Sequence, residues 1–595
     1  MARLLVIGSP SLDILHFAGQ THSSAGGAGM YTAMAAHRCG AQVSIFAPLP
    51  EPMPEALLPV TERLQSWYGP TVPPTEMPHF EISHEGDTAT YLNFIIRAEA
   101  DLVPEMLPDD LSEFDCVHII ALGDANRQHT FLKACRQRGA KCISLGTFID
   151  SVMNAPDIVR SSIQKSDVFF MNENEAICLF GSVEEAKTWP GKVIYITLGE
   201  RGAVVVQGAH QTYLPVVLVK ALDPTGAGDA FCGAALAHLL LGCHPILAAR
   251  LAMPLAAEKT EHVGPTSLFW PEPPPDLDVD QRVVINQPQV ERISGMIEGL
   301  SEVAPFPFVG SNFPPVDHPA TLDFFFASTL QQFSFWTAVD GNYHHPLIAP
   351  IGGLELKGSS YMFQSYVRCL SDDPEFFTPH RQANLTGEDL LAVFRADDGS
   401  DPMPAFDLHL EQARQYGSDM LALGLTPQDV VRQAQASETP LATFQGLLDH
   451  VGGYKEDPLR KKSGLLALIL SQRPEAFLSF GEHEAVAPVI DYHLMRSCLR
   501  TGLIDVVDEP LKRDLTDRLV VSPASEWAVR YAAYWAMKQV VAVSGKSIGA
   551  VDWFFFGARK RCPEMSDPVC RDCPVDPVCA HRKDLFQPVI RTVFY

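Results

Sequence analysis

No stretch of this 595-residue chain approaches the roughly 20 uninterrupted apolar residues that a membrane-spanning helix needs. The first residues, Met1–Gly8, lack a long apolar core followed by small residues, so they predict a β-strand and not a secretory signal. Internal repeats and low-complexity tracts are also lacking. We therefore expect a cytoplasmic protein with no membrane partner, and the length predicts two or more domains.

Positive charge is scarce. The chain has 45 Lys and Arg against 71 Asp and Glu, a formal net charge of -26. Both halves are acidic: from residue 276 onward there are 28 basic and 42 acidic residues, a balance of -14. A protein that binds duplex DNA usually neutralises several phosphates with a basic face. We therefore expect a small-molecule substrate and no nucleic-acid partner.

Cysteine is unevenly distributed. Nine of the thirteen cysteines are scattered singly, as buried small apolar residues are. The other four, Cys562, Cys570, Cys573 and Cys579, are spaced C-x7-C-x2-C-x5-C near the end of the chain. In a cytosolic chain such clustering favours metal ligation over disulfides. The loop 562–579 is therefore predicted to bind an iron–sulfur cluster, with Zn²⁺ as the alternative.

The pattern of the chain changes near residue 272. Residues 1–271 alternate short apolar runs, such as Leu4–Ile7 and Val193–Thr197, with helical segments, which predicts an α/β domain with a mostly parallel sheet and helices on both faces. A Pro-rich acidic stretch at 272–284 is predicted to be a linker. Residues 285–595 are mainly helical in pattern, with long periodic segments such as Glu526–Val540.

One segment of the first domain predicts phosphate chemistry. Asp223-Pro224-Thr225-Gly226-Ala227-Gly228-Asp229 runs directly into the apolar helix Cys232–Leu241. Small residues let the backbone approach a phosphate, and a helix that starts there directs its free N–H groups at the anion. Phosphoryl transfer also needs a base for the attacking hydroxyl, and Asp229 stands at the helix start. A Gly-rich turn alone would be weak evidence.

This segment resembles the second signature of the ribokinase-like (PfkB) kinase family, and companion segments follow the family's order. The resemblance implies that Asp13 holds sugar hydroxyls, that Gly26 and Gly27 belong to the first signature, and that Gly86–Ile96 supplies strands of a substrate lid. It also implies ATP and Mg²⁺ as cofactors. The residues implied for ATP, phosphate and Mg²⁺ are Asn172, Glu175, Thr197, Gly199, Gly202, Thr225, Gly226, Ala227 and Gly228.

Tyr31 departs from the family pattern. The family usually has an Asn that contacts the sugar at this position, five residues after the first glycine of the pair. An aromatic ring there favours a bulkier nucleoside that could stack on it. Packing of Tyr31 in the core is the equal alternative.

The second domain resembles two related groups of enzymes. The cysteine spacing is similar to the cluster loop of the endonuclease III family of helix-hairpin-helix glycosylases, although the first gap there is usually six residues. The segment Val489–Arg500 resembles the helix that carries the catalytic Asp of that superfamily, which implies this role for Asp491, and Lys462 matches the superfamily's lysine. The gap between these two residues, and segments such as Phe333–Trp336, fit better with the queuosine 5′-phosphate N-glycosidase (queuosine salvage) family. That resemblance implies that Phe335 and Trp336 contact a base, with core packing as the alternative.

Together the two resemblances imply a bifunctional nucleoside salvage enzyme. The first domain would phosphorylate the 5′-hydroxyl of queuosine or a related modified nucleoside, and the second would hydrolyse the N-glycosidic bond to free base and ribose 5-phosphate. The alternatives are a sugar or nucleoside kinase fused to a glycosylase-like domain that acts on DNA lesions, or to a non-catalytic binding domain. Assembly as a homodimer is left open.

Overall fold

The computed structural model describes residues 2–16, 20–85, 88–216, 218–271 and 280–595, apart from individual side chains at 20, 84–85, 88–89 and 91, together with the backbone of Phe17. The chain divides into two compact units, Met1–Asp278 and Val279–Tyr595. Most of the predicted linker, residues 272–279, lies outside the described residues. Val283 and Val284, at the end of that predicted linker, lie instead in a strand of the second unit.

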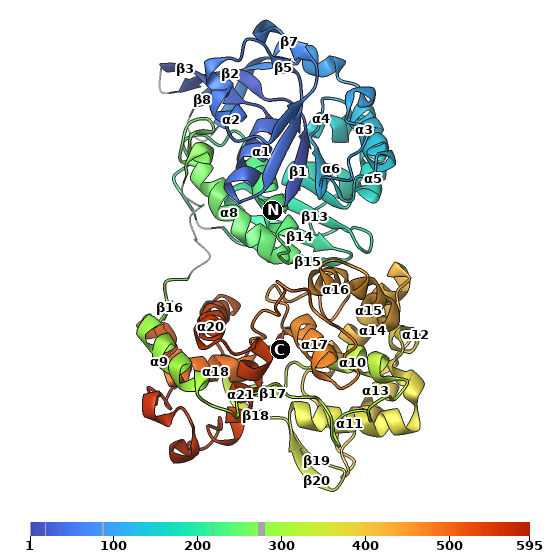
Figure 1. Ribbon diagram of the computed structural model, residues 1–595, viewed down its shortest axis with the longest axis vertical. Coiled ribbons are helices and arrows are strands. Elements are labelled where there is room, and N and C mark those ends of the chain that lie inside the picture. The colour runs from blue at the N-terminus through green and yellow to red at the C-terminus, as the bar shows by residue number, and fades with distance from the viewer. Residues whose placement is uncertain (1, 18–19, 86–87, 217, 272–279) are drawn as a thin grey trace. The chain divides into compact units, whose positions relative to one another are not determined.

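The first unit is built on a nine-stranded sheet (Figure 1). Strands β13 to β6 are parallel, and β14 and β15 extend one edge in antiparallel pairing. Across the sheet, the order is β15 (His210–Leu214), β14 (Ala203–Gln207), β13 (Val193–Thr197), β12 (Val168–Asn172), β11 (Ile143–Gly146), β10 (Cys116–Ile119), β1 (Arg3–Ile7), β4 (Gln42–Phe46) and β6 (Ser66–Tyr68). The predicted α/β domain with a mostly parallel sheet is confirmed.

The central strands are continuous apolar runs because both of their faces are covered. Leu4 to Ile7 of β1 are fully buried, with Ile7 opposite Ile119 on one side and Phe46 on the other. Two groups of helices cover the sheet on opposite sides (Figure 1). One group is α1 (Ala28–Arg38), α7 (Ala227–Leu240) and α8 (Pro245–Thr260), and the other is α3 (Ala125–Gln137), α4 (Ile149–Asn154), α5 (Pro156–Lys165) and α6 (Glu173–Phe180).

A second, four-stranded sheet lies beside the first, with strand order β3 (Gln20–Gly26), β2 (Ser11–Phe17), β8 (His79–Glu85) and β9 (Thr88–Ile95). Strand β9 covers most of the segment predicted to belong to a substrate lid. Gly86 and Asp87 of that segment lie outside the described residues. Short strands β5 (Leu49–Pro50) and β7 (Thr71–Val72) and helix α2 (Leu58–Thr61) complete the unit.

The second unit is mainly helical, as predicted, and has two large apolar cores. The first core involves α10 (Thr321–Thr329), α11 (Ser359–Asp372), α13 (Gly387–Phe394), α14 (Phe406–Leu423), α15 (Pro427–Gln435), α16 (Pro440–Leu448) and α17 (Lys461–Gln472), and the short α12 (Pro379–Ala383) lies against α14. The second involves α9 (Gln287–Glu298), α18 (Tyr492–Thr501), α19 (Glu509–Thr516), α20 (Pro523–Ser544) and α21 (Ile548–Gly557).

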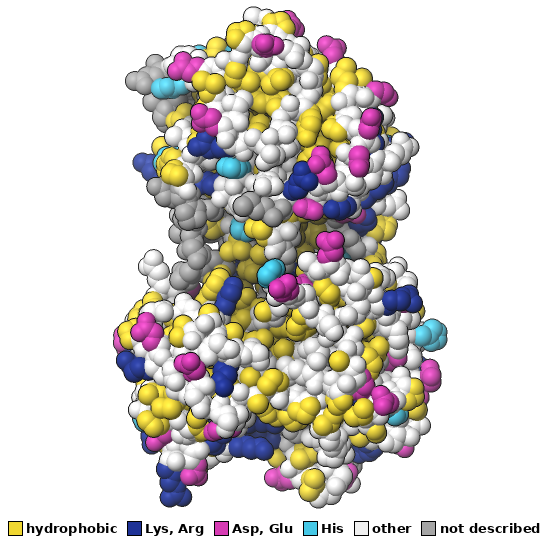
Figure 2. All heavy atoms as spheres, in the orientation of Figure 1, with side chains coloured by type: hydrophobic (Ala, Val, Ile, Leu, Met, Phe, Trp, Pro, Cys, Tyr) yellow, Lys and Arg dark blue, Asp and Glu magenta, His cyan; other side chains and the backbone are white. Residues whose placement is uncertain are grey.

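Three antiparallel strand pairs accompany these helices: β16 (Val283–Ile285) with β21 (Ile504–Val506), β17 (Trp336–Val339) with β18 (Asn342–Pro346), and β19 (Ile348–Ile351) with β20 (Leu354–Lys357). No single helix in the described part of the chain is long and apolar enough to cross a membrane. Only α20 and the helix after it pass such a test together, as a pair bent by 118°. Figure 2 shows acidic and basic side chains interspersed on the visible face of each unit.

Candidate functional sites

The start of α7 is the predicted anion-binding loop. Gly226 is the residue before the helix and has a φ of 76°, in the left-handed region that glycine adopts without strain. No side chain caps the helix, which leaves N–H groups of its first turn available to a ligand, apart from that of Ala227, which donates to the carbonyl oxygen of Pro224 at 3.2 Å. A side chain added at Gly228 would meet no atom of the described residues within 4 Å, which leaves space over these N–H groups.

A buried ion pair holds this loop in place. Asp223 accepts hydrogen bonds from the backbone N–H of Thr225 at 2.9 Å and of Gly264 at 2.8 Å. Lys259 lies 3.2 Å from the same carboxylate and donates to the carbonyl oxygen of Asp223 at 2.9 Å. Burial opposes the charge of Asp223, but Lys259 and the backbone donors outweigh it and lower the pKa of this carboxyl. Lys259 was not predicted, because it follows Asp223 by 36 residues with no motif to mark it.

Tyr31 lies beneath the loop. Its side chain is 3% exposed, and a Cβ atom at Gly226 would come within 2.5 Å of its ring. The ammonium group of Lys259 lies 5.4 Å from the ring centroid. These contacts favour the packing interpretation of Tyr31 over stacking on a nucleoside.

Asp229 is the third residue of α7 and is partly exposed. The surrounding protein removes enough water from its carboxyl group to raise the pKa of Asp229 to about 6. Glu175 lies close enough for the charge of Asp229 to act on it. Burial first, and then that charge, raise the pKa of Glu175 to about 7.

Asn172 and Glu175 form a capping box at the start of α6. The side chain of Asn172 accepts from the backbone N–H of Glu175 at 3.0 Å, and Glu175 accepts from the backbone N–H of Asn172 at 2.9 Å. A further bond of 2.8 Å joins the two side chains. The structure therefore brings the predicted pair together, fixed by reciprocal capping and near Asp229.

Asp13 lies in a buried polar cluster with the two predicted glycines. It is 4% exposed, and burial is the main cause that raises its pKa to about 6. Its Oδ1 atom and the hydroxyl of Ser9 are buried without a hydrogen-bond partner among the described residues. Side chains at Gly26 and Gly27 would collide with Asp13 and with the backbone of Ser9, at 1.7 and 2.5 Å. A buried, unpaired carboxylate oxygen fits an acceptor for ligand hydroxyl groups.

Glu99 belongs to this cluster but was not predicted from the sequence. It is 8% exposed and accepts a 2.9 Å hydrogen bond from the backbone N–H of Ser9. Burial raises the pKa of Glu99. No local pattern marks it, because it reaches Ser9 across 90 residues.

The residues predicted to contact the nucleotide lie in a tight turn after β13. Thr197 ends the strand, and the backbone N–H of Leu198 donates to the carbonyl oxygen of Gly202 at 2.8 Å. Gly199 has a φ of 62°, and a side chain at Gly202 would lie 2.0 Å from the carbonyl oxygen of Leu214. Since β12 and β13 are parallel neighbours, this turn follows the same sheet edge as Asn172.

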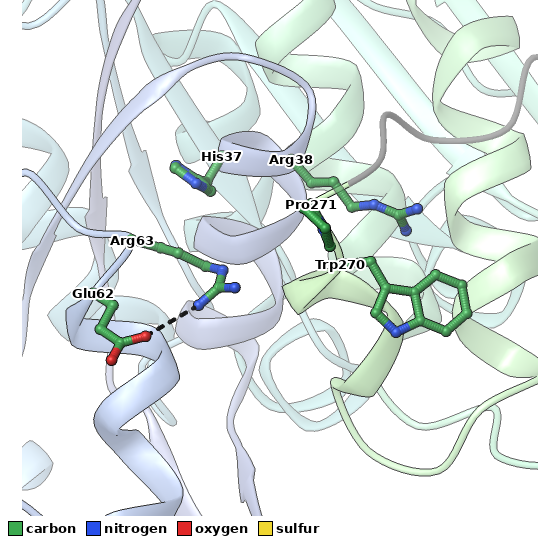
Figure 3. Close-up of a pocket in the computed structure, with 6 residues that line it drawn as sticks. All are labelled: His37, Arg38, Glu62, Arg63, Trp270 and Pro271. Carbon is green, nitrogen blue, oxygen red and sulfur yellow. Dashed lines mark ion pairs between the residues drawn. The ribbon is translucent and has the colours of Figure 1, made fainter.

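A separate pocket of about 370 Å³ lies at the other end of α1 (Figure 3). It contains none of the predicted site residues. Its lining residues are His37, Arg38, Glu62, Arg63, Trp270 and Pro271. Arg38 pairs with Glu258, and Arg63 donates to the carbonyl oxygens of Pro59 and Phe269 at 2.8 and 2.6 Å. Both guanidinium groups therefore already stabilise the fold.

In the second unit, Asp491 precedes α18 and caps it. Its Oδ1 accepts from the backbone N–H groups of His493 and Leu494 at 2.8 and 3.0 Å. Lys461 and Asp552 interact electrostatically with it. Burial and then the charge of Asp491 raise the pKa of Asp552 well above its usual range, although Lys461 opposes this. Two carboxyl groups and one lysine thus form a single cluster.

The predicted Lys462 is fully buried next to this cluster and is directed elsewhere. Its ammonium group donates to the carbonyl oxygen of Leu330 at 2.9 Å and lies 4.9 Å from the ring centroid of Phe333. Burial lowers the pKa of Lys462 to about 7. Lys461 is the lysine whose charge acts together with Asp491. Adjacent residues of a helix differ in direction by about 100°, which sequence spacing could not resolve.

Phe335 and Trp336 are buried beside Tyr492, the residue that follows Asp491. A side chain at Gly358 would lie 3.7 Å from the ring of Phe335 and 3.8 Å from the hydroxyl of Tyr492. Trp336 packs edge-on against Tyr492 with ring centroids 6.5 Å apart. The structure therefore brings both predicted aromatic residues near the predicted carboxylate.

A basic cluster that the sequence did not predict surrounds His493. Glu564 is 1% exposed and pairs with Lys357 at 2.6 Å and with Arg496 at 3.0 Å. Arg559 interacts electrostatically with Asp491 and Tyr492, and burial lowers its pKa. Burial, then the charges of Arg496, Arg559 and Lys357, lower the pKa of His493 well below its usual range. His493 therefore lies among three cations, two of which pair with Glu564.

The four predicted cysteine ligands line one cavity of about 50 Å³. The thiols act on one another: burial, and then the charges of the other three, raise the pKa of Cys579 to about 11. Hydrogen-bond donors already reach two of the sulfur atoms, from Arg500 to Cys562 at 3.2 Å and from the backbone of His581 to Cys579 at 3.4 Å. Four thiols around one cavity, with donors directed at sulfur, fit a metal or an iron–sulfur group.

Comparisons with known proteins concern the first unit. The family model described as pfkB family carbohydrate kinase matches residues 74–273. The chain is 26% identical over 282 residues to the cytidine kinase of Thermococcus kodakarensis, which covers 45% of this chain and 99% of that protein. It is 26% identical over 251 residues to the ribokinase of Bacillus subtilis, covering 39% of this chain and 83% of that protein.

Among solved structures, the nucleoside kinase of Burkholderia thailandensis in complex with inosine aligns with a TM-score of 0.37 and 20% identity, over 45% of this chain and 94% of that one. The family match lies within the unit that contains the anion-binding loop, Asp229 and the capping box. The N-terminal unit therefore resembles kinase domains of the pfkB family over residues 74–273.

Proposed function

We propose that the chain is a bifunctional nucleoside salvage enzyme. The first unit transfers a phosphoryl group from ATP to the 5′-hydroxyl of queuosine or a related modified nucleoside. The second hydrolyses the N-glycosidic bond of that 5′-phosphate to free base and ribose 5-phosphate. The observation that carries the proposal is the presence, in one chain, of a pfkB-family kinase domain and a helical unit in which a carboxylate–lysine cluster adjoins a basic cluster.

In the kinase reaction, Asp229 accepts the proton of the attacking hydroxyl. A carboxyl with a pKa of about 6 is mostly ionised at neutral pH yet more basic than an ordinary Asp. The free N–H groups of α7 stabilise the negative charge that develops on the transferred phosphate. Asp13 binds sugar hydroxyls through its unpaired Oδ1. Asn172 and Glu175 would hold Mg²⁺, which neutralises phosphate charge.

In the hydrolysis, water adds to C1′ of the ribose and the bond from C1′ to the base breaks. Asp491 takes the proton of the water and stabilises the positive charge on the sugar. Asp552, held protonated by its raised pKa, gives its proton to the departing base. Lys461 keeps the negative charge of the cluster balanced. The three cations around His493 support recognition of the 5′-phosphate as a handle.

The test is mass spectrometry of products from anaerobically purified protein with queuosine, Mg²⁺ and ATP. We expect free queuine with the wild type and with the control Asp157→Asn, whose side chain is 94% exposed. Asp229→Asn should release no base from queuosine but should still hydrolyse supplied queuosine 5′-phosphate. Asp491→Asn should accumulate that 5′-phosphate.

Three outcomes would redirect the proposal. Wild-type protein that accumulates the 5′-phosphate without free base would leave the kinase and remove the hydrolytic role of Asp491. An unchanged product profile in Asp491→Asn would favour a binding domain. Tight, salt-sensitive binding of lesion-containing duplex DNA would favour a DNA glycosylase.

A further inference from the structure

Arg561 lies in the wall of the cysteine cavity without using its hydrogen-bonding capacity. It lines the same cavity as Cys562, Cys570, Cys573 and Cys579. Its Nε and Nη2 atoms are buried and have no hydrogen-bond partner among the described residues. Its guanidinium carbon lies 5.3 Å from the ring centroid of Phe554, so an apolar neighbour covers part of the group.

Such an arrangement is costly unless an acceptor is supplied. Burying a charged donor without a hydrogen-bond partner destabilises a fold more than burying an unpaired neutral group does. Asp576 also lines the cavity, but it pairs with His581 at 2.7 Å. The other side-chain acceptors that line the cavity are the hydroxyl groups of Ser497 and Thr501, which donate to backbone carbonyl oxygens, and the four cysteine sulfur atoms. The unused N–H groups of Arg561 therefore indicate a negatively charged ligand between the thiols.

Arg500 donates a hydrogen bond to one of these sulfur atoms. Its Nη1 atom donates to the Sγ atom of Cys562 at 3.2 Å and to the carbonyl oxygen of Pro563 at 2.8 Å. Two arginines thus meet four cysteines at one small cavity. Their two positive charges match the net charge of about -2 that four thiolates give either to Zn²⁺ or to an oxidised [4Fe–4S] core.

The spacing of the thiols separates these two ligands. Four sulfur atoms on one Zn²⁺, each about 2.3 Å from the metal, lie about 3.8 Å from one another. Within the described residues, one group of three possible metal ligands has its ligand atoms within 4.8 Å of one another: Cys570, Asp576 and His581. This group contains only one of the four thiols. The four thiols thus stand wider apart than a single zinc ion requires, around a cavity that a larger core would fill.

We propose that Arg561, together with Arg500, donates hydrogen bonds to the sulfur atoms of a [4Fe–4S] cluster held by the four cysteines. The inference rests on the proposed cluster and is independent of the hydrolytic reaction. Donors to sulfur stabilise the more negative, reduced state of a cluster and so raise its reduction potential. Arg561 acts through the cluster and has no assigned part in breaking the N-glycosidic bond, so it is a positioning residue.

The experiment uses the full-length chain reconstituted anaerobically with iron and sulfide. Iron and sulfide content, the visible and electron paramagnetic resonance spectra, and the midpoint potential are measured for the wild type, Arg561→Met, Arg561→Lys and Arg571→Met. Arg571 is the matched control, because it lies in the same segment with its side chain 87% exposed. Circular dichroism and kinase rates confirm that each variant is folded.

We expect about four iron atoms per chain in the wild type and in Arg571→Met, with equal midpoint potentials. Arg561→Met should show a more negative potential and faster bleaching in oxygen, with Arg561→Lys in between. Loss of iron from a folded Arg561→Met alone would support the same role. Equal potentials and bleaching rates in all four proteins would overturn it, as would a wild type that binds one Zn²⁺ and takes up no iron.

Discussion

Asp229 and Glu175 both have raised pKa values, and the charge of Asp229 makes Glu175 harder to ionise. The pKa of Asp229 is about 6 and that of Glu175 about 7, both raised first by burial. A base must be deprotonated to accept the hydroxyl proton. The rate of phosphoryl transfer should therefore fall by about tenfold per pH unit below pH 6 and be flat above it. Steady-state rates between pH 5 and 8 would measure this.

ATP also gains a proton in this pH range. A variant is therefore needed to show which group causes the fall in rate at low pH, the acidic limb of the profile. Asp229→Asn removes the proposed base, so its residual activity should lose the limb near pH 6. A limb that stays at the same pH in this variant would assign the titration to ATP and not to Asp229.

Asp552 and Asp491 should respond differently to the leaving group. As the proposed acid that protonates the base, Asp552 should contribute about 10²-fold or more, so Asp552→Asn should slow hydrolysis of the nucleoside 5′-phosphate by that factor. A 4-nitrophenyl riboside 5-phosphate has a leaving group, 4-nitrophenolate, that departs without a proton. This substrate should therefore restore the rate of Asp552→Asn but not that of Asp491→Asn. Stopped-flow absorbance measures both, and equal rescue of the two variants would contradict the assignment.

At the scale of elements, the contact between α1 and α7 depends on one glycine. A Cβ atom at Gly233 would lie 2.0 Å from the carbonyl oxygen of Thr32, in rigid backbone. Gly233→Ala should therefore push the helices apart and destabilise the first unit by about 1–3 kcal/mol. Because α7 also carries Asp229, kcat should fall as well. Thermal denaturation and kinase assays would test both effects.

Gly228 offers a matched control on the same helix. Nothing in the described residues lies within 4 Å of a side chain there, and Ala favours a helix over Gly by up to about 1 kcal/mol. Gly228→Ala should therefore keep or raise stability while it raises the KM for ATP, since its methyl group occupies the phosphate space. The same loss of stability in both variants would contradict the assignment of the contact to Gly233.

Local segments could be predicted from the sequence, whereas distant partners could not. The loop at Gly226, the helix that starts with it and the pair Asn172 and Glu175 follow from consecutive residues with fixed backbone preferences. Lys259 reaches Asp223 across 36 residues, and Glu99 reaches Ser9 across 90, so only the folded chain shows these contacts.

The direction in which a side chain leaves its helix could not be predicted from the sequence either. Lys461 and Lys462 have the same chemistry and differ only in direction on α17. The sequence also left Tyr31 undecided between stacking and packing, and the close contact with Gly226 favours packing.

For the whole molecule, separate apolar cores in the two units predict separate unfolding transitions. A ligand that binds one folded unit stabilises it by about 2.7 kcal/mol at 100 times its Kd. In calorimetry of the full-length chain, ATP should therefore raise the temperature of one transition only. Removal of the proposed cysteine-bound group with a chelator should lower the temperature of the other transition. A single transition shifted by both treatments would show that the units unfold together.

The covalent connection of the two units has a consequence for flux. One transcript delivers a kinase domain and its proposed partner activity in a fixed one-to-one ratio, whatever the level of expression. The pool of phosphorylated intermediate in a cell is then set by the two turnover numbers and not by transcription. A lineage that inherits this single gene inherits both proposed steps at once. Loss of either proposed catalytic aspartate, Asp229 or Asp491, would leave the remaining step without its supply or its outlet.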